Sequence, residues 1–133
     1  MLFKSLLFAL ACAGSSLAVF VTHSPRYDNE TEKLGNTACP NLELRYPYLV
    51  TLPNYPNIAA ADFITNSSVL CGTCWNVTTP IGTSIFVLAI DRAHYGFTLS
   101  NEAFDFLTEG RVNELLFVDA TAVQVGNYLC GMS

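Results

Sequence analysis

The placement of the cysteines is the feature that most constrains how this chain can fold. Two of them stand in Cys71-Gly-Thr-Cys74, while Cys39 and Cys130 lie far away on either side. A C-x-x-C pair occurs in thioredoxin-like redox sites, in zinc sites and in disulfide frameworks, and each use implies a different protein. The rest of the sequence has to decide among these three uses.

Residues 1–18 have the pattern of a secretory signal peptide. Lys4 precedes an apolar run from Leu6 to Ala13, and Ser16-Leu17-Ala18 offers small residues for cleavage. The apolar run is well short of the roughly 20 residues that span a bilayer, and no later segment reaches that length, so no membrane span is expected. Cleavage would remove the fifth cysteine, Cys12, and leave four in an oxidising compartment. This predicts two disulfides and a secreted protein, extracellular or in the cell wall.

The remaining 115 residues (133 minus 18) fit one domain, residues 19–133, with a modest core that cross-links would help to stabilise. Without Lys4 the domain has five basic and eleven acidic residues, a net charge near −6 (5 minus 11). With this charge and no basic patch, a nucleic-acid partner or an anionic membrane surface is unfavourable.

The neighbours of the C-x-x-C pair argue against redox and zinc chemistry. Residues 75–78 favour a strand, whereas a thioredoxin-like site would be followed by a helix. Zinc would need further ligands at finger-like spacing, but His23 and His94 stand alone. We therefore expect no metal and no cofactor, and two half-cystines with different partners. Spacing alone leaves three connectivities open.

Short strands dominate the expected secondary structure. Strands are predicted over residues 20–24, 75–78, 84–90 and 115–125, a rigid extended connection over 52–58 and one or two helical turns over 59–65. A short helix is predicted after Ser100, which is a suitable N-cap, with Gly110 just past its end. Trp75 is expected in the core. A mainly β fold closed into a barrel follows.

Several motifs, taken in order, resemble the cerato-platanin family of secreted fungal proteins. They are Val21-Thr22, Tyr27-Asp28-Asn29, the 52–58 stretch Leu-Pro-Asn-Tyr-Pro-Asn-Ile, Cys71-Gly-Thr-Cys-Trp75, Val87-Leu-Ala-Ile-Asp91, Gly96-Phe97 and Val118-Asp-Ala-Thr-Ala-Val-Gln-Val125. The resemblance covers nearly all of residues 19–133. It implies a six-stranded double-psi β-barrel, similar to one expansin domain and to barwin-like endoglucanases, with bridges joining Cys39 to Cys71 and Cys74 to Cys130.

The resemblance also implies binding to chitin or cellulose-type polysaccharides and their oligosaccharides, expansin-like loosening, self-assembly at interfaces and elicitation of plant defence, with a plant surface receptor as a further partner. Tyr27, Asp28, Asp91 and Thr98 are the candidate carbohydrate-binding residues. Asp91 matches a wall-binding aspartate of expansins, but Thr98 stands where expansins and related endoglucanases carry an acidic residue.

A glycosidase needs two carboxyl groups across the scissile bond. Because threonine cannot act as a general acid, one member of the pair is missing unless Asp28 or Asp105 replaces it. We therefore expect no catalytic residues, with a weak endoglucanase as the alternative. A simpler role for Asp91 is to cap a turn or bind a backbone amide. If it binds sugar, Asp91→Ala should weaken polysaccharide binding and leave the fold intact.

Three glycosylation sequons begin at Asn29, Asn66 and Asn76. Asn29 and Asn66 are expected in loops and are the candidates for modification, whereas Asn76 is expected in a strand and unmodified. Ala59-Ala60 replaces a glycine pair usual in the family, and Arg92 replaces a common histidine. Ligand preference therefore does not transfer safely from the family.

Overall fold

The computed structural model describes residues 15–133. Lys4, the apolar run and Cys12 of the predicted signal peptide lie outside the described residues. The first strand, β1 (Ser16–Ser24), begins before the predicted strand and includes the last three residues of the predicted leader. None of the helices formed by residues 15–133 is long and apolar enough to cross a membrane.

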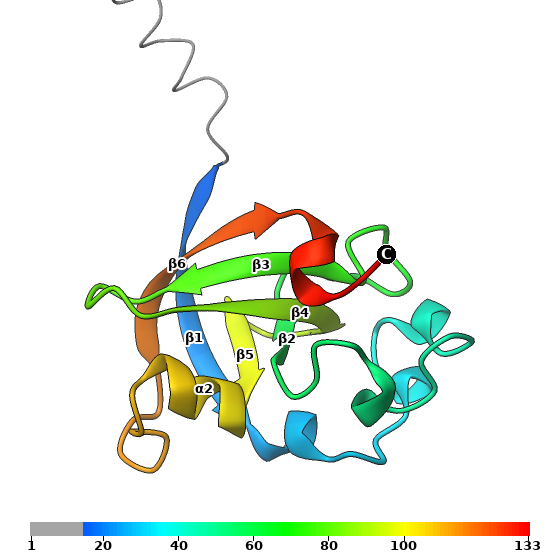
Figure 1. Cartoon of the computed structure of the whole chain (residues 1–133), viewed down its shortest axis with the longest axis horizontal. Coiled ribbons are helices and arrows are strands. Elements are labelled where there is room, and N and C mark those ends of the chain that lie inside the picture. The colour runs from blue at the N-terminus through cyan, green and yellow to red at the C-terminus, as the bar shows by residue number, and fades with distance from the viewer. Residues whose placement is uncertain (1–14) are drawn as a thin grey trace, which may run out of the picture.

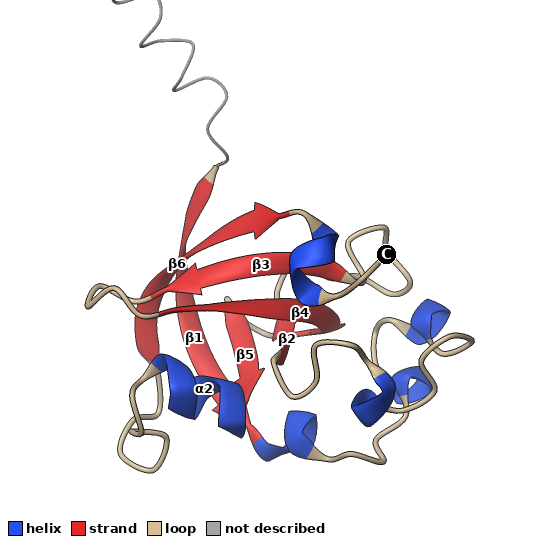
Figure 2. Ribbon diagram, viewed as in Figure 1, coloured by secondary structure: helices blue, strands red, loops and turns tan. Residues whose placement is uncertain are grey.

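Six strands close into a barrel in the order β1-β5-β2-β4-β3-β6, which confirms the predicted six-stranded barrel (Figures 1 and 2). After β1 the strands are β2 (Ile58–Ala61), β3 (Thr73–Thr78), β4 (Ser84–Arg92), β5 (Phe97–Ser100) and β6 (Val118–Val125). The β1–β5 and β2–β4 pairs are parallel and the other four pairs are antiparallel. Closure leaves no long unpaired strand edge.

The barrel interior is filled by alternate residues of the strands, as the period of two requires. Trp75, Val77, Val87 and Phe97 belong to this cluster, and Phe63 packs against Trp75 with the two rings tilted by 41° and their centroids 4.7 Å apart. Trp75 is 6% exposed, and its indole N–H donates to Thr73 Oγ1 over 2.8 Å. The prediction that Trp75 belongs to the core is confirmed.

A second core cluster lies outside the barrel, between strands β2 and β4 and the segment from residue 25 to residue 57. Leu34, Leu49 and Leu52 of this segment pack with Leu88 and Ile90 of β4. The segment forms short 3₁₀ helices, Pro25–Asp28, Leu34–Asn36, Pro40–Leu42 and Leu49–Thr51, beside the barrel in Figure 1. Because this cover buries the outer face of β4, the strand is apolar on both faces, as its unalternating sequence predicts.

The two disulfides join Cys39 to Cys71 and Cys74 to Cys130, the pairing that the resemblance implies. The first ties the 25–57 cover to the turn that precedes β3. The second ties β3 itself to the C-terminal 3₁₀ helix Asn127–Cys130. The C-x-x-C pair thus connects one strand to two distant parts of the chain.

Helix α2 (Asn101–Leu107) begins as predicted, with Ser100 Oγ accepting a hydrogen bond from the N–H of Ala103 over 3.1 Å. The predicted helical turns over 59–65 are wrong, because Ile58–Ala61 forms the buried strand β2. Alanine favours helices, but β4 and β5 pair with this segment on either side and override that preference. The predicted extended connection over 52–58 instead forms turns that lead into β2.

Candidate functional site

Four strands place one residue each in a row across the outer face of the barrel. Thr22 of β1 is in register with Thr98 of β5, Thr98 with Ala60 of β2, and Ala60 with Asp91 of β4. Registered neighbours project from the same face of a sheet, so Thr22, Thr98 and Ala60 share the outer face. The β2–β4 register shifts between Ala59 and Ala60, and the contacts of the Asp91 carboxylate with Tyr27 and Ala38 of the cover place it on this face too. We call Thr22, Thr98, Ala60 and Asp91 the four-strand row.

The carboxylate of Asp91 is held by four hydrogen bonds from the protein. Its Oδ1 accepts from the backbone N–H groups of Ala38 and Arg92, both over 2.8 Å. Its Oδ2 accepts from the hydroxyl of Tyr27 over 2.7 Å and from Nη1 of Arg26 over 3.2 Å. A carboxylate has about four lone-pair sites, so those of Asp91, which is 6% exposed, are all used.

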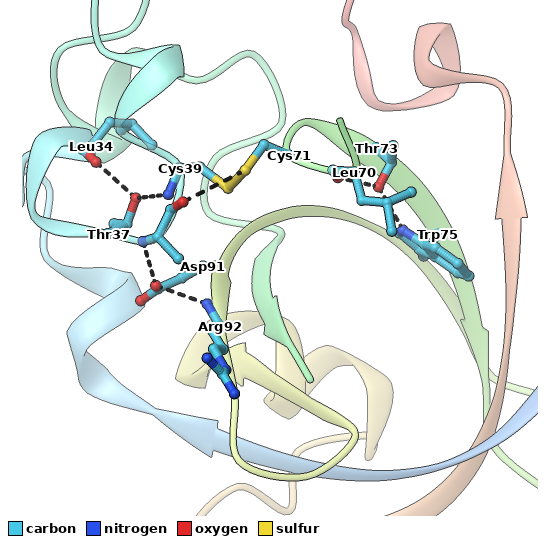
Figure 3. Close-up of a disulfide and its surroundings, with 10 residues drawn as sticks. Leu34, Thr37, Cys39, Leu70, Cys71, Thr73, Trp75, Asp91 and Arg92 are labelled. Carbon is cyan, nitrogen blue, oxygen red and sulfur yellow. Dashed lines mark hydrogen bonds between the residues drawn. A yellow bond between two sulfur atoms is a disulfide. The ribbon is translucent and has the colours of Figure 1, made fainter. Parts of the chain in front are cut away.

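Asp91 and the first disulfide fix the same short segment of the cover (Figure 3). Asp91 binds the N–H of Ala38, and the next residue, Cys39, is bonded to Cys71. The hydroxyl of Thr37 accepts from the N–H of Cys39 over 3.0 Å and donates to the Leu34 carbonyl over 2.7 Å. The cover is therefore attached to the barrel at one point by a covalent bond and a buried carboxylate.

Tyr27 and Arg26 extend this arrangement to the surface. Tyr27 is 5% exposed, and burial, its hydrogen bond to Asp91 and the negative charge of Asp91 raise the pKa of its hydroxyl well above the ordinary value. Arg26 also binds Oε2 of Glu32 and the carbonyl of Asn36, both over 2.9 Å. Partial burial lowers the pKa of Arg26, but the hydrogen bond to Glu32 and the charge of Asp91 outweigh it and raise that pKa.

Asp28 serves a different local purpose, because its carboxylate binds the start of α2. Its oxygens accept from the N–H groups of Asn101 over 2.6 Å and Glu102 over 3.0 Å, where the helix dipole favours an anion. The hydroxyl of Tyr55 donates to the Asp28 carbonyl. Burial, followed by the charges of Glu30, Asp28 and Glu102, raises the pKa of Tyr55.

Among the four predicted residues, Thr98 has the polar group that is most available to a ligand, its hydroxyl. Its hydroxyl lies 2.9 Å from that of Thr22, and both side chains are half-buried. A hydroxyl can donate once and accept twice, so this pair retains hydrogen-bonding capacity toward a ligand. Beyond the ends of β2 and β4, Asp62, Arg92, Ala93 and His94 line a shallow hollow of about 310 Å³.

The structure thus places Asp91 and Thr98 in one row and joins Tyr27 directly to Asp91, while Asp28 lies at the start of α2. Sequence reasoning missed Arg26 and Thr22. Thr22 stood within a motif that the family resemblance rests on, but only the strand register pairs it with Thr98. The turn-capping alternative for Asp91 describes its contacts with Ala38 and Arg92, so Asp91→Ala is expected to lower the stability of the fold as well as any binding of sugar.

The carboxyl groups considered for a glycosidase pair are engaged elsewhere. Asp28 binds the start of α2, and Oδ1 of Asp105 accepts from the N–H of Val112 over 3.1 Å. Thr98, the position at which the resemblance to expansins leads one to expect a second acid, is a threonine. Among residues 15–133, no three histidine, cysteine or acidic side chains are grouped so as to hold a metal ion.

The sequons fall in two kinds of surroundings. Asn29 and Asn66 are exposed, and Oδ1 of Asn29 accepts from the N–H and hydroxyl of Thr31. Asn76 lies in β3 with its Oδ1 buried and without a hydrogen-bond partner in the part of the chain described. Asn29 and Asn66 remain the candidates for modification.

Comparison with known proteins decides the family. The cerato-platanin family model matches residues 19–132. The chain belongs to the cerato-platanin family. Cerato-platanin of Ceratocystis fimbriata f. sp. platani is 36% identical over 118 residues, covering 82% of this chain and 87% of that protein.

Solved structures agree with this assignment. Cerato-platanin 2 of M. perniciosa has a TM-score of 0.82 at 31% identity, over 87% of this chain and 100% of that one. The fungal elicitor cerato-platanin, solved in solution, has a TM-score of 0.76 at 35% identity, over 84% and 96%. A Clavibacter michiganensis expansin crystallised with cellohexaose has a TM-score of 0.59 at 23% identity, over 84% of this chain and 50% of the expansin, and shares the fold.

Proposed function

We propose that this cerato-platanin is a secreted, non-catalytic cell-wall protein that binds chitin- or cellulose-type polysaccharides, or their oligosaccharides, at the four-strand row. The observation that carries the proposal is the half-buried pair of hydroxyls of Thr22 and Thr98 on the outer face of the barrel, in the same row as the buried Ala60 and Asp91. An expansin of the same fold was crystallised with cellohexaose, which supports a β-linked glucan or chitin chain as the ligand.

The residues of the row and its surroundings have different roles in this proposal. Thr22 and Thr98 hydrogen-bond sugar hydroxyls directly, and the exposed guanidinium of Arg26 donates from the side. Asp91 and Tyr27 are positioning residues, because their polar groups bind each other and the cover. Asp28 positions the start of α2 beside the row.

Binding without hydrolysis follows from the chemistry of the row. Retaining and inverting glycosidases both require two carboxyl groups that flank one bond, and the row has a single carboxylate whose oxygens already accept four hydrogen bonds. Loosening would then come from competition with the hydrogen bonds between polysaccharide chains. A weak endoglucanase remains the alternative to test.

The test combines binding and hydrolysis on the same samples. The purified protein is incubated with insoluble chitin and with crystalline cellulose, and the bound fraction and the reducing ends released are measured. We expect saturable binding to at least one polymer and no reducing ends above a heat-denatured control. Release of reducing ends that increases with protein concentration would establish the endoglucanase instead, and absence of binding to both polymers would refute the proposal.

We also propose that a plant surface receptor perceives the protein, because a related cerato-platanin at 35% identity is described as a fungal elicitor. Infiltration of leaves with the folded and the reduced, alkylated protein tests this. A defence response to the folded form alone is expected, and no response to either form would contradict it.

A further inference from the structure

The outer face of the barrel continues past the four-strand row, toward the end of the barrel at which β2 and β4 finish. Phe20 lies two residues before Thr22 in β1, and Gly96 lies two residues before Thr98, at the start of β5. β1 and β5 run side by side in Figure 1. Side chains two apart in a strand project from the same face, about 7 Å from each other. Phe20 therefore lies beside Thr22 on the surface to which we assign polysaccharide binding.

Phe20 presents an aromatic ring that is partly open to solvent. The ring is 38% exposed, although it stacks on Phe117 with centroids 4.3 Å apart. Phe117 approaches from the β6 side of β1. On the β5 side stands Gly96, whose added Cβ would lie 2.0 Å from the Phe20 carbonyl oxygen, so no side chain at that position covers the ring. The stack fixes the orientation of Phe20, which lowers the entropy lost when a ligand covers it.

Polar groups lie directly on the other side of Gly96. Its N–H donates to Oδ2 of Asp62 over 2.8 Å, and its carbonyl accepts from the N–H of Asp62 over 2.9 Å. Asp62 is exposed, and among residues 15–133 its Oδ1 accepts no hydrogen bond. Asp62 also lines the shallow hollow of about 310 Å³, together with Arg92, Ala93 and His94. The surface thus passes from an aromatic ring over a glycine to an acceptor and a guanidinium donor.

The distances and charges of these groups select a neutral, polyhydroxylated ring. Neighbouring strands lie about 4.8 Å apart, so Gly96 forms a floor about 10 Å wide between Phe20 and Asp62, enough for one sugar ring. Asp62 and Arg92 have opposite charges, so neither an anion nor a cation is favoured by both. A purely apolar ligand would desolvate these charges without pairing them. A pyranose ring has an apolar face for Phe20 and hydroxyls that donate to Asp62 and accept from Arg92.

We propose that Phe20, Asp62 and Arg92 form a second sugar subsite, occupied by the neighbouring sugar residue of a polysaccharide chain bound at the four-strand row. This inference rests on the proposed function. It has the chain run along β1 and β5 and not across the strands, because the two sites are separated along the strand direction. Phe20 supplies the stacking surface, and Asp62 and Arg92 orient the ring.

The test measures the affinity of the purified protein for cellohexaose and for the hexamer of N-acetylglucosamine by isothermal titration calorimetry. Phe20→Leu keeps an apolar side chain against Phe117 but removes the aromatic face, so it should weaken binding about fivefold. Phe20→Tyr keeps that face and should bind within about twofold of the wild type. The matched control is Phe106→Leu, at a phenylalanine of α2 that is 61% exposed and outside both sites, and it should bind normally.

The polar side of the subsite is tested with Asp62→Asn. Its amide oxygen can still accept from Gly96, but the group facing the ligand becomes a donor, so binding should weaken about fivefold. Melting curves that coincide with the wild type establish that each variant is folded. The subsite is refuted if the wild type binds and either Phe20→Leu or Asp62→Asn binds equally well, or if Phe20→Tyr loses as much as Phe20→Leu. Absence of binding by the wild type would instead refute the proposed function, and the subsite with it.

Discussion

Replacing Asp91 with alanine removes the acceptor of four hydrogen bonds at once. The Tyr27 hydroxyl and the Ala38 N–H would be left buried or half-buried without a partner, at a cost of about 1–3 kcal/mol each. The exposed Arg26 keeps its hydrogen bonds to Glu32 and Asn36, so losing its ion pair with Asp91 costs about 0–1 kcal/mol. Asp91→Ala should therefore lower the free energy of unfolding by about 2–7 kcal/mol, a large share of the roughly 5–15 kcal/mol typical of a domain.

The assay is equilibrium unfolding in urea at neutral pH, followed by the fluorescence of Trp75, the single tryptophan. Asp91→Asn is the matched control, because its amide oxygen can still accept from Ala38 and Arg92, and it should cost only about 1–2 kcal/mol. If Asp91→Ala unfolds within about 1 kcal/mol of the wild type, the carboxylate does not hold the cover to the barrel and our account of the site is wrong.

Three further perturbations test other parts of the structure. The raised pKa of Tyr27 means that its contribution to stability is complete below the unfolded-state pKa of about 10 and is lost as the pH rises through the folded-state pKa. Tyr27→Phe should therefore flatten the alkaline fall in the free energy of unfolding, and an unchanged fall would contradict this. Gly96 has φ +53°, and a Cβ there would lie 2.0 Å from the Phe20 carbonyl oxygen. Gly96→Ala should lower the melting temperature sharply by separating β1 from β5, and a wild-type melting curve would disprove that close approach. Replacing both Cys74 and Cys130 with alanine opens a loop of 56 residues and should cost about 4 kcal/mol in urea unfolding, and a cost below about 1 kcal/mol would exclude a major stabilising role.

Local signals in the sequence predicted the elements that depend on local chemistry. The unalternating run 84–90 became β4, and Ser100 caps α2 as its position before the apolar stripe indicated. β6 begins at Val118 and not at Leu115, because the segment before it turns away and the Leu115 carbonyl lies 3.0 Å from Nε2 of His23. Strand ends depend on such distant partners, which no local window contains.

The site could be predicted only in part for the same reason. Family resemblance selected Asp91, Tyr27 and Thr98, but the partners of Asp91 lie 53 and 64 residues away in the sequence, at Ala38 and Tyr27. Nothing in the sequence indicated that these partners would occupy the carboxylate. The prediction of helical turns over residues 59–65 was wrong for a related reason. Ala59 and Ala60 favour a helix on their own, but β4 and β5 pair with them on both sides and form a strand.

Binding of a double variant, Thr22→Val with Thr98→Val, to insoluble polysaccharide tests the central claim most directly. The substitution removes both partners of one hydrogen bond and keeps their shape, so the fold should be nearly unaffected. Thr121→Val, on the exposed face of β6, is the matched control. The account predicts that the double variant binds about tenfold more weakly than the wild type while the control binds normally. Equal binding of all three proteins, with unfolding curves that coincide, would show that the four-strand row is not the polysaccharide-binding surface.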